Sequence, residues 1–190
     1  MPKQTVVGLD LAGSSKNPSG FAELRNNQLD TEEIYSDDDI LGRCTHIGPR
    51  VVAIDAPLSL PVRGNLRAAD KSLIARGCRV FPPTFGGMKS LTARGMGIAT
   101  RLRANGIKVI EIHPRTSGMI LFGKPDRAAW VSELEKWELQ LKQRASEHEI
   151  DAAMAAVTGL LWLKKKVEEV GDPREGVIII PRGPRALERA

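Results

Sequence analysis

The sequence predicts an α/β fold with a mixed five-stranded sheet, an antiparallel meander followed by parallel strands, flanked by helices. Three predicted strands follow one another across short turns, an apolar one at residues 5–12 and two more at 21–25 and 28–35. Turns this short join antiparallel neighbours. The apolar strand 50–55 follows a helix, so we expect it to pair in parallel with the first strand through a right-handed crossover. The strand 108–112 follows another helix and completes the predicted sheet.

The helices are predicted from capping residues and apolar periodicity. Ser36 followed by three aspartates marks the start of the first helix, because an N-cap hydroxyl and early acidic residues both stabilise a helix N-terminus. Trp130 and Trp137 recur on one face of a later helix and are expected in the core. The predicted helices cover residues 36–48, 66–76, 92–105, 125–141 and 146–169, and a short final strand covers 177–180.

The composition is that of an ordinary globular protein of one domain, residues 1–190, with an elaborated middle segment at about 58–106. No apolar stretch reaches the length of a membrane span, and Met1–Gln4 leaves no room for a signal peptide before the first strand. Two cysteines outside any CxxC pattern argue against a zinc site and favour a cytoplasmic location. The net charge of +5 suits a polyanionic partner without requiring one.

Single acidic residues interrupt several apolar elements. Asp10 lies in the first strand and Asp55 ends the strand 50–55. For Asp10 alone, a cap on the following turn is as good an interpretation as a functional carboxylate. If the two strands are parallel neighbours, however, both carboxylates lie near their C-terminal ends, where open α/β sheets bind ligands. Asp151, beside the apolar stripe of the last helix, and Glu111, within the strand 108–112, extend the pattern.

Such acidic residues would repel one another unless a cation compensated them. Magnesium and manganese prefer carboxylate and water ligands, so a site for Mg²⁺ or Mn²⁺ is expected, with two ions bound. Two ions about 4 Å apart can activate water and stabilise the leaving oxygen in phosphodiester hydrolysis. The pattern therefore predicts a divalent metal centre with a hydrolytic function.

Three segments resemble the ribonuclease H-like superfamily, namely residues 7–12, 52–57 and 148–153. The chain is similar in particular to the predicted nucleases of the domain-of-unknown-function 429 family, and its Asp-Ala-Ala run resembles that of bacterial Holliday-junction resolvases. The resemblance implies that Asp10, Asp55 and Asp151 bind two metal ions and that the substrate is DNA or RNA. Resolvase relatives often carry a further acid where this chain has His148, which is either a ligand or base or a surface residue. Glu111 matches the family motif, with a catalytic role and a buried salt bridge to an arginine both open.

Arginines near the predicted site are candidates for binding phosphate. Arg63 and Arg67 flank the loop after Asp55, and Arg94 lies on the helix 92–105. A pair between Arg67 and Asp70 on one helix face is the competing interpretation for that arginine. The glycine-rich middle segment could close over a strand of nucleic acid or form a solvated surface loop.

Two other functions remain open from the sequence. The same fold could serve as a non-catalytic module that binds nucleic acid or protein. The strand and polar turn at residues 8–16 also resemble the start of sugar and acetate kinases, but 190 residues leave room for only one of their two domains. The sequence leaves the oligomeric state open, a homodimer included.

Overall fold

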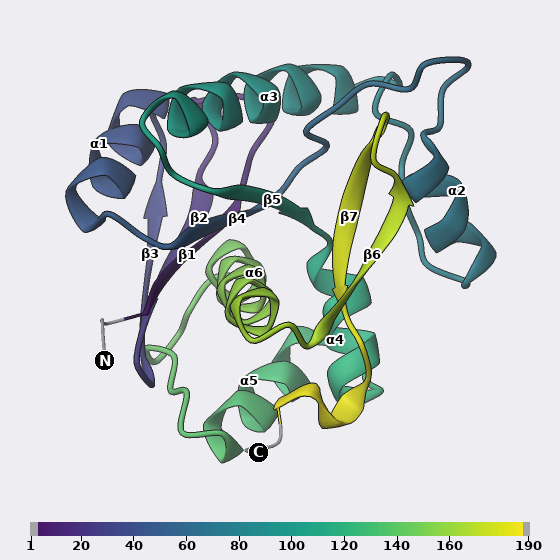
Figure 1. The fold of residues 1–190 in the computed structure, drawn as a ribbon. Helices are drawn as coiled ribbons and strands as arrows, with labels where there is room; N and C mark the ends of the chain where they lie inside the picture. The colour runs from purple at the N-terminus through teal and green to yellow at the C-terminus, as the bar shows by residue number, and fades with distance from the viewer. Residues whose placement is uncertain (1–3, 188–190) are drawn as a thin grey trace.

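The computed structural model describes residues 4–187, which form a seven-stranded mixed sheet in the order β3-β2-β1-β4-β5-β7-β6 (Figure 1). The strands are β1 Thr5–Asp10, β2 Ser19–Arg25, β3 Gln28–Ile34, β4 Val51–Asp55, β5 Val109–Ile112, β6 Val167–Asp172 and β7 Gly176–Pro181. β1, β2 and β3 form the predicted antiparallel meander, and β1, β4 and β5 pair in parallel. The predicted α/β class is confirmed, whereas the predicted count of five strands is wrong.

Helices cover both faces of the sheet (Figure 1). They are α1 Asp37–Ile47, α2 Ala68–Ala75, α3 Met88–Ala104, α4 Pro114–Phe122, α5 Arg127–Lys136 and α6 Glu147–Leu163, with a 3₁₀ turn η1 at Pro184–Leu187. One core cluster joins α1 and α3 to the sheet, and a second lies beneath α6 and includes residues of α4 and α5. A third cluster packs α2 on β6 and β7. None of the helices in residues 4–187 combines the length and hydrophobicity needed to cross a bilayer.

The position of α6 depends on glycines in the strands beneath it. A Cβ at Gly8 would overlap the Ala152 carbonyl oxygen, and one at Gly20 would overlap that of His148. The backbone of α6 therefore lies directly on β1 and β2, closer than any side chain on those strands would allow. This contact fixes the N-terminal half of α6 over the end of β1.

The C-terminal part of the chain differs most from the prediction. The helix predicted for 146–169 ends at Leu163, and Val167–Asp172 is β6, which pairs antiparallel with β7. Lys165 has a positive φ of 58°, which stops the helix and reverses the chain. The helix predicted to reach residue 141 ends at Lys136, and Glu138 also has a positive φ, of 62°. The helix α4 was not predicted, although His113 caps it and accepts a hydrogen bond from the amide of Thr116.

Candidate functional site

Asp10, Asp55 and Asp151 converge at one end of the central strands. One carboxylate oxygen from each residue lies within 4.8 Å of the corresponding oxygens of the other two. Asp10 and Asp55 end β1 and β4, and Asp151 lies in the second turn of α6. Asp10 and Asp55 also line a cavity of about 170 Å³. We call these three residues the acidic triad.

Strand register and alternation explain the convergence. The parallel pairing of β1 with β4 sets Asp10 directly beside Asp55. In β1, Val7 and Leu9 face the cluster beneath α1 and α3, so Asp10, one residue on from Leu9, faces α6 instead. The close contact of α6 at Gly8 then brings Asp151 over both strand ends.

Burial and mutual repulsion raise the pKa values of the two strand acids. Desolvation is the main cause for Asp10, whose pKa rises from 3.8 to about 6 against the opposing effect of its hydrogen bond with His148. Desolvation, followed by the charges of Asp10 and Asp151, raises the pKa of Asp55 well above its usual value. In the described part of the chain, no hydrogen-bond donor reaches the Asp55 carboxylate. By contrast, His148 is hydrogen-bonded to Asp10, and Arg127 donates to Asp151. A half-buried carboxylate that is desolvated and faces two other carboxylates is most stable when it takes up a proton or receives a cation.

A histidine and an arginine contact the rest of the triad. Nδ1 of His148 lies 2.7 Å from Oδ2 of Asp10. Arg127, the first residue of α5, donates two hydrogen bonds to the Asp151 carboxylate, at 2.8 and 2.6 Å, and its third nitrogen lies 3.1 Å from Glu147. Sequence reasoning missed Arg127, since its only local signal is its place after the helix-capping Asp126, and its contact with Asp151 spans 24 residues.

Glu111 faces the other side of the sheet. It pairs with Ile54 in the β4–β5 register, one residue before Asp55, and side chains alternate along a strand. Its carboxylate accepts hydrogen bonds from both terminal nitrogens of Arg67, at 2.7 and 2.6 Å, and from the amide of Leu58 at 2.8 Å. The structure thus shows the salt-bridge alternative for Glu111, and Glu111 is not a member of the triad.

Arg67 is buried, with 1 % of its side chain exposed, and also binds Asp70 through two nitrogens. The guanidinium is therefore held by two carboxylates, which corrects the expectation that it faces a substrate phosphate. Its role in the structure is to fasten the loop after β4 to β5 and α2. Arg67 and Glu111 both line the 170 Å³ cavity from the side away from α6.

The two other arginines differ in availability. Arg94 is 7 % exposed and binds Asp37 together with the carbonyl oxygens of Ala12 and Tyr35. Arg94 therefore holds the loop after β1 against α1, and its charge is balanced by Asp37 instead of a substrate phosphate. Arg63 is exposed on the loop before α2 and is free to contact a ligand.

The donor set of the triad fits a hard divalent cation. Oxygen ligands lie about 2.0–2.1 Å from Mg²⁺, so two ligands of one ion are separated by at most about 4.2 Å. A spread of up to 4.8 Å therefore requires a small inward movement for one ion, or allows the carboxylates to be shared between two. Either arrangement would neutralise the charge that raises the pKa of Asp55.

Comparison with known proteins gives the family and the fold. The sequence model of DUF429, described as a protein of unknown function, matches residues 8–176. The chain belongs to this family. The DUF429 chain is similar to "T. thermophilus RuvC in complex with Holliday junction substrate", at 14 % identity and a TM-score of 0.57, over 85 % of this chain and 96 % of that one. A second structure, "Thermus thermophilus RuvC structure", is 16 % identical with a TM-score of 0.46 over the same shares. No curated protein matches the sequence.

The likeness to the RuvC structure with the higher TM-score confirms the ribonuclease H-like fold that the sequence motifs predict. At 14 % identity the likeness establishes fold alone. The chemistry of the DUF429 chain must be argued from its own residues.

Proposed function

We propose that this protein is a metal-dependent nuclease that hydrolyses phosphodiester bonds of DNA or RNA. The observation that carries the proposal is the convergence of three carboxylates at the ends of β1 and β4, with a half-buried Asp55 that lacks a hydrogen-bond donor in the described chain. The RuvC structure with the same fold contains a Holliday junction, which supports a nucleic acid as the ligand. Phe81, 67 % exposed at the same cavity, offers a ring on which a base could stack.

In this proposal the acidic triad holds one or two Mg²⁺ or Mn²⁺ ions, which supply the charge that activates water and stabilises the leaving oxygen. His148 orients the Asp10 carboxylate through its 2.7 Å hydrogen bond. Glu111 and Arg67 act indirectly, because they fix the loop that begins at Ala56, directly after Asp55. Arg63 remains the candidate among the predicted arginines for a phosphate contact.

The test is cleavage of a panel of labelled substrates, comprising a four-way junction, single strands and an RNA–DNA hybrid, during titration with Mg²⁺ or Mn²⁺. We expect metal-dependent cleavage of at least one substrate by wild type and a loss of at least a hundredfold in Asp55→Asn. Asp30→Asn changes an exposed aspartate on β3 in the same way and should cleave as wild type does. Equal activity of Asp55→Asn and wild type would refute the proposed role of the triad.

A non-catalytic module is the second candidate, and the Arg127 contact is the observation that favours it. A bidentate guanidinium can satisfy Asp151 permanently, so that no ion is needed there. The two candidates differ in metal binding: a nuclease should show a rise in unfolding temperature with Mn²⁺ that is absent from Asp55→Asn. A protein that binds nucleic acid without any response to the ion fits the second candidate.

A further inference from the structure

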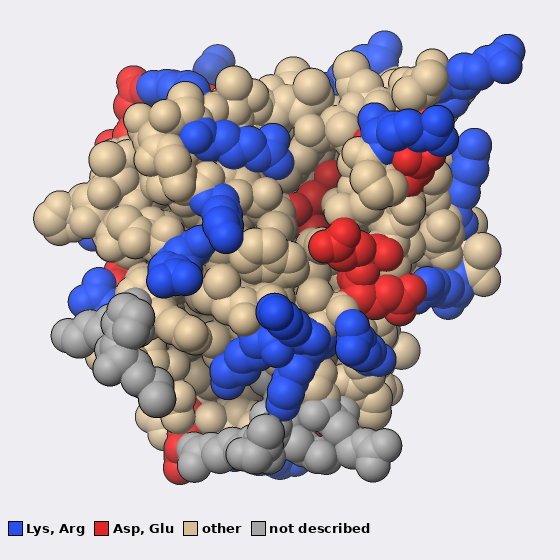
Figure 2. All heavy atoms as spheres, in the orientation of Figure 1, with Lys and Arg blue, Asp and Glu red and all other residues tan. Residues whose placement is uncertain are grey.

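A second surface of the protein carries a different chemistry. A groove of about 830 Å³ opens between the C-terminal end of α6, the starts of β4 and β5, and the β6–β7 hairpin. In Figure 2 basic side chains lie around the end of α6 and acidic ones over β6. We call this surface the basic groove, and its lining residues with polar or aromatic side chains are Arg50, Lys108, Trp162, Lys165, Glu168, Glu169 and Arg182.

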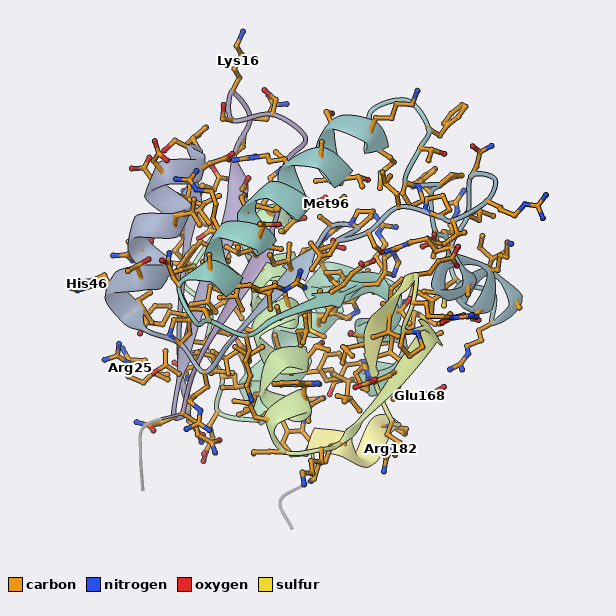
Figure 3. The ribbon with its side chains drawn as sticks, turned by 45° about the horizontal axis from the view of Figure 1, so that its top comes forward. Lys16, Arg25, His46, Met96, Glu168 and Arg182 are labelled. Atoms are coloured by element: carbon orange, nitrogen blue, oxygen red, sulfur yellow. The ribbon has the colours of Figure 1, made fainter. Side chains whose placement is uncertain are left out.

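The cations of the basic groove outnumber its acids. No carboxylate of the described chain forms an ion pair with Arg50, Lys108, Lys165 or Arg182. Glu168 is already neutralised by Arg76, whose hydrogen bond is the main cause of its lowered pKa, with a smaller effect from Arg182. Figure 3 shows Glu168 and Arg182 near the same end of the hairpin. The groove thus offers several cations to an anionic ligand.

An aromatic ring lies among these cations. Trp162 is partly exposed, and Nζ of Lys108 lies 5.8 Å from the centroid of its ring. Tryptophan faces of this kind stack with nucleobases, and the stacking contributes about 1–3 kcal/mol per base. The Lys108 ammonium group lies at the end of a flexible side chain. It can therefore move from the ring to a neighbouring phosphate when a base stacks on Trp162.

The basic groove lies away from the acidic triad. Asp151 and Trp162 are on the same helix, 11 residues apart, which corresponds to about 16 Å along α6. Arg50 and Lys108 immediately precede β4 and β5, whereas Asp55 ends β4 at the other end. A ligand in this groove is therefore recognised by residues that take no part in the triad.

We propose that the basic groove binds a single strand of nucleic acid, with its cations on successive phosphates and the ring of Trp162 against a base. The four cations come from four separate segments, before β4, before β5, after α6 and after β7, which suits a chain of phosphates better than one small anion. A membrane surface is a poorer match, because none of the large apolar side chains exposed in the described chain lines the groove. The proposal requires no metal and no cleavage, so it is independent of the proposed nuclease function.

The test is fluorescence anisotropy of a labelled oligothymidine in EDTA, measured over a range of salt concentrations. Each phosphate contact with a single strand contributes about 0.7 to the slope of log affinity against log salt. We expect the double variant Lys108→Gln with Arg182→Gln to lower that slope by about 1.4 and to weaken binding at least tenfold at low salt. Trp162→Leu should weaken binding about fivefold or more, with a smaller change in slope.

Lys71→Gln on α2 is the matched control, since it removes an exposed cation outside the groove, and it should bind as wild type does. Asp55→Asn should keep its affinity in EDTA, which separates this result from the outcome of the cleavage assay. Thermal unfolding of each variant checks that it is folded. Wild-type affinity in the double variant, or an equal loss in Lys71→Gln, would overturn the proposal. Binding to anionic vesicles without binding to the oligonucleotide would also overturn it, in favour of a lipid ligand.

Discussion

Replacing Asp10 with asparagine should stabilise the metal-free protein at neutral pH. Folding raises the pKa of this carboxyl from 3.8 to about 6, mainly by desolvation. That change is roughly two pKa units at about 1.4 kcal/mol each, so ionised Asp10 destabilises the folded state by about 3 kcal/mol. The side chain is 14 % exposed, so solvent screens this cost only in part. Asparagine cannot ionise and avoids the cost.

The sign of the effect fixes its pH dependence. Below pH 3.8 the carboxyl is protonated in both states, and Asp10→Asn should match wild type. Between pH 3.8 and 6 the unfolded chain loses the proton first, so wild type loses stability as the pH rises, and the full difference is reached above pH 6. For a chain of this size, about 3 kcal/mol corresponds to roughly 6–12 °C in the unfolding temperature.

Thermal unfolding followed by circular dichroism in EDTA, from pH 4 to 8, measures this difference. Asp30→Asn is the control and should show no pH-dependent gain, because its carboxyl is exposed. Mn²⁺ at 1,000 times its dissociation constant should reverse the order of stability, since it adds about 4.1 kcal/mol to wild type only, more than the cost of ionised Asp10. If Asp10→Asn is less stable than wild type at pH 7.5, the pair with His148 outweighs desolvation and the reasoning is wrong.

Three further variants test the architecture around the triad. Arg127→Met frees the Asp151 carboxylate from a bidentate pair and should tighten Mn²⁺ binding about tenfold or more by calorimetry, whereas weaker binding would show that Arg127 supports the ion. Arg67→Met leaves two buried carboxylates without their cation and should cost about 3–5 kcal/mol in urea unfolding, against about 1 kcal/mol or less for Arg76→Met at an exposed pair. Gly8→Ala should cost about 1–3 kcal/mol and weaken Mn²⁺ binding as α6 is displaced. Gly42 lies in α1, where an added Cβ would meet no atom within 4 Å, so Gly42→Ala should instead be neutral or stabilising. Equal losses of stability in both alanine variants would contradict the close-packing argument.

Local patterns were sufficient where neighbouring residues decide the outcome. The meander, the helix at Ser36 and the parallel pairing of the strands that carry Asp10 and Asp55 all follow from turn length, capping and apolar runs. The prediction was wrong at residues 164–172, because it continued the apolar helix α6 into the segment that forms β6. Val167 and Val170 lie in a strand that pairs with β7, and their side chains are buried in the core clusters beside α6 and α2, contacts between segments that periodicity within one segment does not reveal.

The sequence by itself determined that acidic residues stand at the ends of apolar elements, because a lone carboxylate in an apolar run is visible without any partner. Only the tertiary structure decided which of them meet. Strand alternation turns Glu111 away from the triad toward Arg67, and the close approach of α6 at Gly8 and Gly20 brings Asp151 to Asp10 and Asp55. The tertiary structure also brings Arg127 to the Asp151 carboxylate. The energy of a charged group depends on the groups that surround it in space, and for these residues the surroundings come from distant parts of the chain.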